Sequence, residues 1–204
     1  MPRRIKTFGG QHQTLPIKDE KLLKHFMYNL LIKRDKARSK CKKYQADRNY
    51  MLCLVGFNTA FRAEDLLQLR VCDLKDGYVH IKENKTGKMQ NFRMNKQLRQ
   101  EILDYIERNN LADHDYMFLG QKKKQDGKTY SYPITRQRAY KIIKKNADEV
   151  GIGFTFGVHS LRKTFGYMYI KNGGKPETLM KMYKSRIVAM SFCEPRSCKR
   201  PLSS

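Results

Sequence analysis

A histidine and an arginine three residues apart, His159 and Arg162, are the side chains of this sequence best spaced to do chemistry together. Residues three apart share one face of a helix, so an imidazole and a guanidinium would point the same way. Gly157 and Val158 precede them, and the first N–H groups of a helix attract anions. This pattern is typical of a phosphate site. Taken alone, it is more often an amphipathic helix whose solvent-facing side carries a histidine and an arginine.

The apolar residues of the same segment predict how it is held. Leu161, Phe165 and Met168 recur at positions i, i+4 and i+7, on the side of a helix turned away from the polar pair. We therefore expect this side to be buried and His159 and Arg162 to be exposed.

The charge of the chain narrows the class of its partner. Its 204 residues include 43 Lys and Arg against 19 Asp and Glu, a formal net charge of +24. A surplus this large normally meets a polyanion: nucleic acid is the first candidate and an anionic membrane surface the second. The sequence holds no apolar run long enough to span a bilayer, so we expect no transmembrane segment.

The five cysteines are odd in number, and no two have the Cys-x-x-Cys spacing. They predict neither a disulfide framework nor a zinc site, and they favour a reduced, cytoplasmic setting. The first six residues are basic, and no apolar region of a secretory signal follows them.

Apolar periodicity predicts one mainly helical domain with a small antiparallel β-sheet, an α+β arrangement. Residues 78–83 and 89–94 flank the turn at 84–87 and predict a hairpin. Residues 121–128, rich in Lys and Gln, are expected to form a flexible loop. Helical stripes or helix caps occur at four places: Ile17, Tyr50, Asn95 and Thr135.

Four features occur in an order that is typical of a known family. Arg62 lies in Phe-Arg-Ala-Glu-Asp-Leu-Leu-Gln-Leu-Arg, Lys85 in the turn Lys-Thr-Gly-Lys, and His159 and Arg162 in His-Ser-Leu-Arg. Over roughly residues 45–182, the chain resembles the catalytic domain of the tyrosine recombinases, the phage- and transposon-type integrases. The resemblance implies that family's catalytic-domain fold and an origin in a phage or another mobile genetic element.

The family cuts DNA by attack of a tyrosine on a phosphodiester, which leaves a 3′-phosphotyrosine link and a free 5′-hydroxyl without a metal or other cofactor. By this resemblance, Arg62 and Arg162 would bind the non-bridging phosphate oxygens. Lys85 would protonate the leaving 5′-oxygen, and His159 would accept or relay the tyrosine proton. Asp65 would position its neighbours.

Double-stranded DNA is therefore the expected partner, and the family implies assembly as a multimer on it. We expect further DNA contacts from four basic residues: Lys88, Arg93, Arg136 and Lys163. The expected activity is site-specific recombination by strand breakage and rejoining. The alternative is a DNA-binding module of integrase ancestry that does no chemistry.

The family's nucleophilic tyrosine has no clear counterpart. Tyr183 is the last tyrosine and lies too early for the family's spacing, so we interpret it as a packing residue and assign it only a weak claim as nucleophile. We expect a basic arm or linker stub over residues 1–16 and an integrase catalytic-type domain over residues 17–185. Residues 186–204 lose their periodicity and indicate a divergent, truncated or frame-shifted tail.

Overall fold

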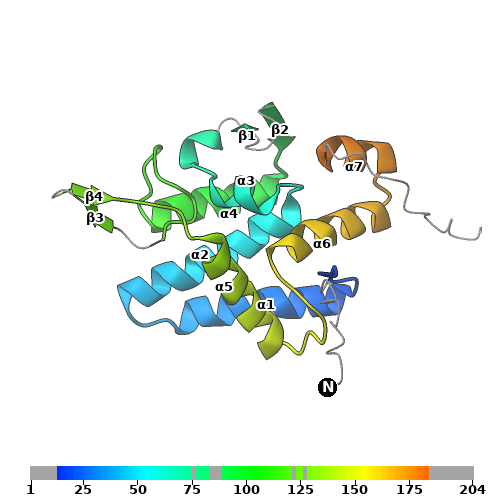
Figure 1. Ribbon diagram of the computed structural model, residues 1–204, viewed down its shortest axis with the longest axis horizontal. Coiled ribbons are helices and arrows are strands. Elements are labelled where there is room, and N and C mark those ends of the chain that lie inside the picture. Colours follow the sequence, from blue (N-terminus) through cyan, green and yellow to red (C-terminus); the bar gives the residue numbers. More distant parts are fainter. Residues whose placement is uncertain (1–12, 75–76, 83–88, 121–122, 126–127, 184–204) are drawn as a thin grey trace, which may run out of the picture.

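The computed structural model describes residues 13–74, 77–82, 89–120, 123–125 and 128–183. They form a mainly helical body with two small antiparallel sheets at its edge (Figure 1). The helical elements, in chain order, are α1 (Glu20–Lys36), α2 (Lys40–Asn58), α3 (Ala63–Leu67), the 3₁₀ turn η1 (Val71–Asp73), α4 (Lys96–Arg108), α5 (Arg136–Glu149), α6 (Val158–Lys171) and α7 (Pro176–Tyr183).

Both sheets have two antiparallel strands. Strand β1 (Tyr78–Lys82) pairs antiparallel with β2 (Met89–Arg93), which confirms the predicted strand pairing and the α+β fold class, while the predicted turn at 84–87 lies outside the described residues. Strand β3 (Lys123–Gln125) pairs with β4 (Lys128–Tyr130), so the prediction of a flexible loop was wrong at residues 123–125 and 128, and the rest of that stretch lies outside the described residues. This pairing rests on backbone hydrogen bonds, which the Lys- and Gln-rich composition did not indicate.

Local chemistry sets where two helices begin. Asn95 precedes α4, and its side chain accepts a hydrogen bond from the backbone N–H of Leu98 at 2.7 Å. Thr135 precedes α5, and its hydroxyl accepts from the N–H of Arg138 at 3.2 Å. Both caps were predicted, because a polar side chain that satisfies an open N–H group marks a helix start.

Helix α2 runs through the middle of the body and packs against α1, α4 and α6 (Figure 1). An aromatic cluster joins three parts of the chain around it. The ring of Phe26 in α1 lies 5.6 Å from that of Phe57 in α2 and 5.5 Å from that of Phe156, just before α6. This cluster holds the segment that leads into α6 against the core.

The buried side of α6 differs from the predicted stripe. Leu161 is buried as expected, but Phe165 and Met168 are only half-buried. Ser160 and Thr164 are fully buried instead, and the Thr164 hydroxyl donates to the Ser160 carbonyl at 2.8 Å. The helix is therefore rotated toward small polar residues whose hydrogen bonds are satisfied inside the body.

The segment ahead of α1 explains the burial of Thr164. The N–H of Ile17 donates to Thr164 Oγ1 at 3.0 Å, and the Ile17 side chain is fully buried. Lys163 Nζ donates to the carbonyl of Thr14 at 2.6 Å. The end of the predicted arm, residues 1–16, is thus attached to α6. None of the helices in the described segments has both the length and the apolar character needed to cross a bilayer.

Candidate functional site

The first turn of α6 is fixed by close contacts with α5 and α2. A Cβ on Gly157, the residue before the helix, would lie 2.8 Å from the ring of Tyr140 in α5. The start of α6 can therefore approach α5 this closely only because residue 157 is glycine. The N–H of Gly157 donates to Ser160 Oγ at 3.1 Å. On the other side, Leu161 packs against Gly56 of α2. The following polar face is therefore held in a defined orientation.

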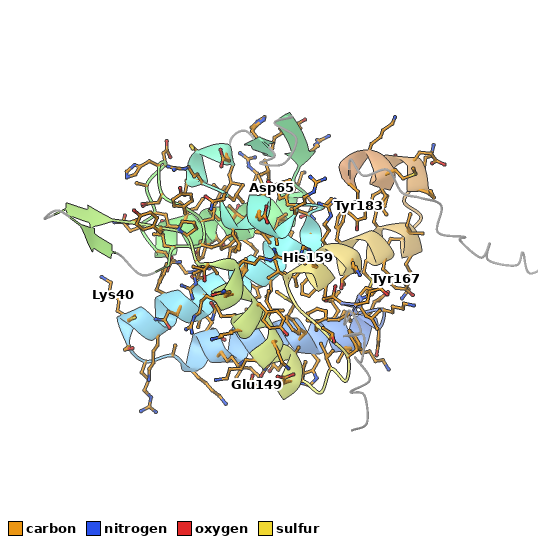
Figure 2. All side chains as sticks on the ribbon, viewed as in Figure 1. Lys40, Asp65, Glu149, His159, Tyr167 and Tyr183 are labelled. Atoms are coloured by element: carbon orange, nitrogen blue, oxygen red, sulfur yellow. The ribbon has the colours of Figure 1, made fainter. Side chains whose placement is uncertain are left out.

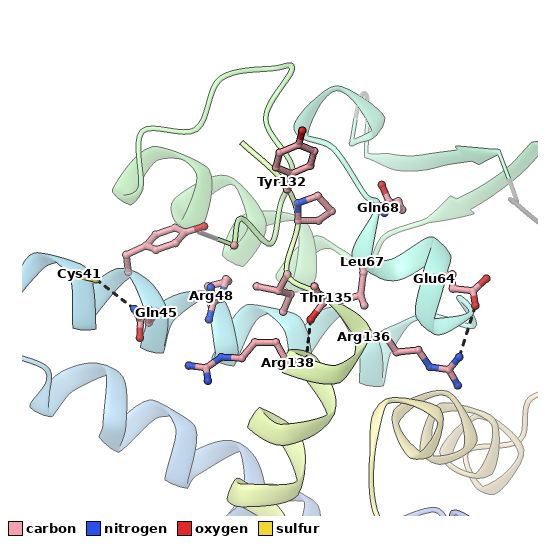
Figure 3. A pocket seen from close by; sticks show the side chains of 14 residues that line it. Cys41, Gln45, Arg48, Glu64, Leu67, Gln68, Tyr132, Thr135, Arg136 and Arg138 are labelled. Carbon is pink, nitrogen blue, oxygen red and sulfur yellow. Dashed lines mark hydrogen bonds and ion pairs between the residues drawn. The ribbon is translucent and has the colours of Figure 1, made fainter. Parts of the chain in front are cut away.

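His159 lies on the exposed side of this turn and meets an arginine from α5. Arg136 is the first residue of α5, and its Nη2 lies 2.8 Å from His159 Nε2. The Nη1 of Arg136 lies 3.7 Å from Glu64 Oε1 in α3, the ion pair drawn in Figure 3. Three helices that are distant in the sequence thus contribute one ionisable group each to this place.

The pKa of His159 is lowered from its ordinary value. Desolvation by the surrounding protein is the largest cause, and the positive charges of Arg136, Lys163 and Arg162 act in the same direction. Glu64 opposes them with a smaller effect. The imidazole is therefore held in its neutral form among an excess of cations.

Asp65 belongs to α3, next to Glu64, and Arg62 lies just before that helix. Arg62 precedes the first residue of the helix and is half-buried, and Asp65 is buried with 3% of its surface exposed. One nitrogen, Nη1, is shielded from solvent in Arg62 and also in Arg162. Helix α3 packs against α5, and α6 packs against α2, which leads directly into the Arg62 loop.

Arg162 is covered on one side by the end of α7. Its guanidinium carbon lies 4.4 Å from the centre of the Tyr183 ring, and its Nη2 donates to the Tyr183 carbonyl at 2.9 Å. The Tyr183 hydroxyl donates to the backbone carbonyl of Arg162 at 2.6 Å. Burial raises the pKa of Tyr183. Figure 2 shows His159 and Tyr183 on their neighbouring helices and Asp65 on α3.

The other predicted residues lie in different places. Lys163 contributes to the field at His159, but its ammonium group is bonded to the Thr14 carbonyl. Arg93 is exposed at the end of β2, the strand that follows the hairpin turn. Lys85 and Lys88 lie outside the described residues. The structure therefore brings His159, Arg162 and Arg136 together, and it places Arg93 on the separate hairpin.

Sequence reasoning missed Glu64 and a neighbouring cavity of about 910 Å³ between α2, α3 and α5 (Figure 3). Arg48 and Arg138 line this cavity together with Glu64 and Arg136. Arg48 is only 5% exposed, and its Nη1 donates to the Leu119 carbonyl at 2.8 Å. The sequence signal that could have pointed to this cavity is Arg48, an arginine placed just before the apolar stretch of α2.

Comparisons with known proteins identify the relatives of the chain. The probable integrase/recombinase YoeC of Bacillus subtilis (strain 168) is 32% identical over 123 residues, which are 60% of this chain and 62% of YoeC. The type 1 fimbriae regulatory protein FimB of Escherichia coli (strain K12) is 28% identical over 134 residues, 63% of this chain and 62% of FimB. The chain thus spans less than two thirds of the length of these curated relatives.

Solved structures share the fold at low sequence identity. The XerH site-specific recombinase, bound to a palindromic difH substrate in a post-cleavage complex, has a TM-score of 0.62 and 19% identity, over 89% of this chain and 49% of that one. The catalytic domain of bacteriophage HP1 integrase has a TM-score of 0.52 and 15% identity, over 84% of this chain and 82% of that one. The model of the phage integrase family matches residues 21–190. The chain belongs to the phage integrase family.

Proposed function

We propose that this chain is the catalytic part of a tyrosine-type site-specific recombinase, which breaks and rejoins DNA strands through a 3′-phosphotyrosine intermediate. Family membership supports the class of reaction, and the relative XerH was solved with a difH substrate after cleavage. The observation that carries the proposal is the cluster of cations at His159: Arg136 Nη2 lies 2.8 Å from its Nε2, and Arg162 and Lys163 add positive charge that Glu64 opposes.

Like charges this close repel one another, and the repulsion costs stability in the free protein. A phosphodiester placed among them would turn this repulsion into attraction. Guanidinium groups suit such a ligand, because their planar donors match two phosphate oxygens and keep their charge at any physiological pH. In this proposal Arg62 and Arg162 bind the non-bridging oxygens of one phosphate.

The remaining roles follow the order of the reaction. His159 takes the proton from the attacking hydroxyl, and Lys85 gives a proton to the leaving 5′-oxygen. Asp65 acts through its neighbours in α3, because it is buried and does not reach the surface where DNA would lie. Negative charge that develops on the non-bridging phosphate oxygens is stabilised by donors that are already in place, which is the largest contribution expected of such a site.

Tyr183 favours a second candidate function. Its hydroxyl is held by the carbonyl of Arg162 and its ring covers the guanidinium, so it serves packing better than attack. No tyrosine occurs in residues 184–204, so the second candidate is a module of integrase ancestry that binds duplex DNA and does no chemistry. In either case we propose duplex DNA as partner, assembly as a multimer on it, and an origin in a mobile genetic element.

Two measurements separate these functions. Fluorescence polarisation with labelled duplex DNA should show an affinity that falls steeply with salt, because each neutralised phosphate releases counterions. Arg162→Ala should weaken binding, whereas Lys24→Ala, an exposed lysine on α1, should change it little. An unchanged affinity in Arg162→Ala would overturn the phosphate site.

The chemistry is tested with a pool of nicked duplexes of randomised sequence, which trap any covalent intermediate. A protein–DNA adduct that survives denaturing electrophoresis and is absent in Arg162→Ala supports the recombinase. Salt-dependent binding without an adduct supports the second candidate.

A further inference from the structure

The contact between Arg136 and His159 has a chemical direction. A guanidinium carries only hydrogen-bond donors, so the nitrogen that it meets at 2.8 Å, Nε2, must be the acceptor. A neutral imidazole with Nε2 as acceptor carries its proton on Nδ1. In the described structure, the basic nitrogen of His159 is therefore the one that Arg136 covers.

We propose that Arg136 is a positioning residue that holds His159 in its neutral Nδ1–H form and covers the basic nitrogen until a phosphate draws the guanidinium away. The inference rests on the proposed function, because it assigns His159 a proton-transfer role at a DNA phosphate. It adds what that function leaves open, namely what sets the proton position of His159 and when its basic nitrogen becomes accessible.

The contacts of Arg136 allow it both to hold His159 and to move away from it. Its side chain is 58% exposed, and its second contact is a 3.7 Å ion pair with an equally accessible carboxylate, Glu64. Exposed pairs of this kind are weak, so an arriving phosphate can compete for the guanidinium. Figure 3 shows the Arg136 side chain reaching from the start of α5 toward Glu64.

The charges that act on His159 come from three helices. Arg136 lies on α5, Arg162 and Lys163 on α6 itself, and Glu64 on α3. Removing Arg136 takes away both a donor to Nε2 and a positive charge. A phosphate that attracts Arg136 would draw the same donor and positive charge away from Nε2. It would also add negative charge nearby, which favours proton uptake by the imidazole. The arrival of DNA would thus prepare His159 to take the proton of the attacking hydroxyl.

The free protein, labelled with ¹⁵N-histidine, tests the first half. Long-range ¹H–¹⁵N spectra distinguish the two tautomers, and His159→Gln identifies the signals of His159. We expect the Nδ1–H form in the wild type and a shift toward the Nε2–H form, with a higher pKa of His159, in Arg136→Ala. Arg136→Lys keeps a cationic donor and should retain the Nδ1–H form.

The matched control is Arg138→Ala, which removes an exposed arginine of the same helix that lines the same cavity but has no contact with His159. It should leave the His159 signals as in the wild type. An Nε2–H form in the wild type, or identical His159 signals in Arg136→Ala and the wild type, would overturn the inference.

Duplex DNA tests the second half. At saturation, established by polarisation on the same sample, the wild-type His159 signals should move in the direction seen in Arg136→Ala. Unchanged His159 signals while the duplex is bound would overturn the release of the guanidinium. A failure of the duplex to bind would appear in the polarisation itself and would count against the proposed function, separately from the free-protein spectra.

Discussion

The first turn of α6 and the side of α6 that faces α7 are built in opposite ways. Around His159 the neighbours are Arg136, Arg162 and Lys163, so mostly like charges are held together. Beside α7, the ring of Tyr183 lies over Arg162, and two hydrogen bonds link the residues in both directions. The groups beside α7 satisfy one another within the chain. The excess positive charge around His159 is balanced only when an anion is added.

This difference teaches where to look for function on a helix that serves both purposes. Contacts that are satisfied within the protein contribute to stability and need no ligand. An excess of one charge costs stability, and natural proteins keep such costs mainly at sites that bind or react. Arg162 belongs to both regions, since one side of it is covered by Tyr183 and its charge also acts on His159.

The largest expected effect comes from the residue that anchors both regions to the core. Leu161 is buried against Gly56 of α2, so Leu161→Ala should lower the free energy of unfolding by about 2–5 kcal/mol. Urea unfolding followed by circular dichroism measures this loss. A change near zero would mean that α6 is held mainly by its polar contacts.

A smaller effect is expected where α7 meets α6. A Cβ on Gly166 would lie 2.1 Å from the Tyr183 hydroxyl. Gly166→Ala should therefore destabilise the protein by about 1–3 kcal/mol, although alanine is otherwise the better helix residue. Gly153→Ala is the control, because a Cβ there meets nothing within 4 Å. A more stable Gly166→Ala variant would show that the Tyr183 contact does not hold in solution.

Removing only the Tyr183 hydroxyl makes the comparison sharper. Tyr183→Phe loses the hydrogen bond to the Arg162 carbonyl and should cost about 0.5–1.5 kcal/mol in unfolding free energy. Its affinity for duplex DNA should match the wild type, and so should any adduct formed with nicked duplexes. Loss of the adduct in this variant alone would identify Tyr183 as the nucleophile and contradict its packing role.

The smallest effect concerns pH. Because the pKa of His159 is lowered in the folded state, the unfolded chain binds a proton more readily there. This contribution to stability is complete above the ordinary value of about 6.5 and is lost as pH falls through the lowered value. Urea unfolding at pH 7.5 and pH 5.5 should therefore show a greater loss for the wild type than for His159→Gln. Equal losses would contradict the lowered pKa of His159, which desolvation and the neighbouring cations produce together.

The parts of the fold that depend on neighbouring residues could be predicted from the sequence. Asn95 and Thr135 mark helix starts because their side chains bond to N–H groups a few positions along the chain. The rotation of α6 could not be predicted in this way. Thr164 is buried because the N–H of Ile17 needs an acceptor, and that partner is 147 positions away in the sequence.

The candidate site divides in the same way. The spacing of His159 and Arg162 places them on one helix face, and only resemblance to a family adds Arg62 to them. The contact of Arg136 with His159 depends on how α5 packs against α6, which periodicity does not specify. Glu64 was missed for the same reason, because an exposed acidic residue gains meaning only from the arginine beside it.

The hydrogen bonds that attach the segment ahead of α1 to α6 have a mechanical consequence. The Thr14 carbonyl is bonded to Lys163 and the Ile17 amide to Thr164, next to Arg162 on the same helix. Tension applied to the chain before Thr14 would be transmitted to α6 directly through these two hydrogen bonds. The segment that holds Thr14 and Ile17 would then move together with the helix that carries the candidate site.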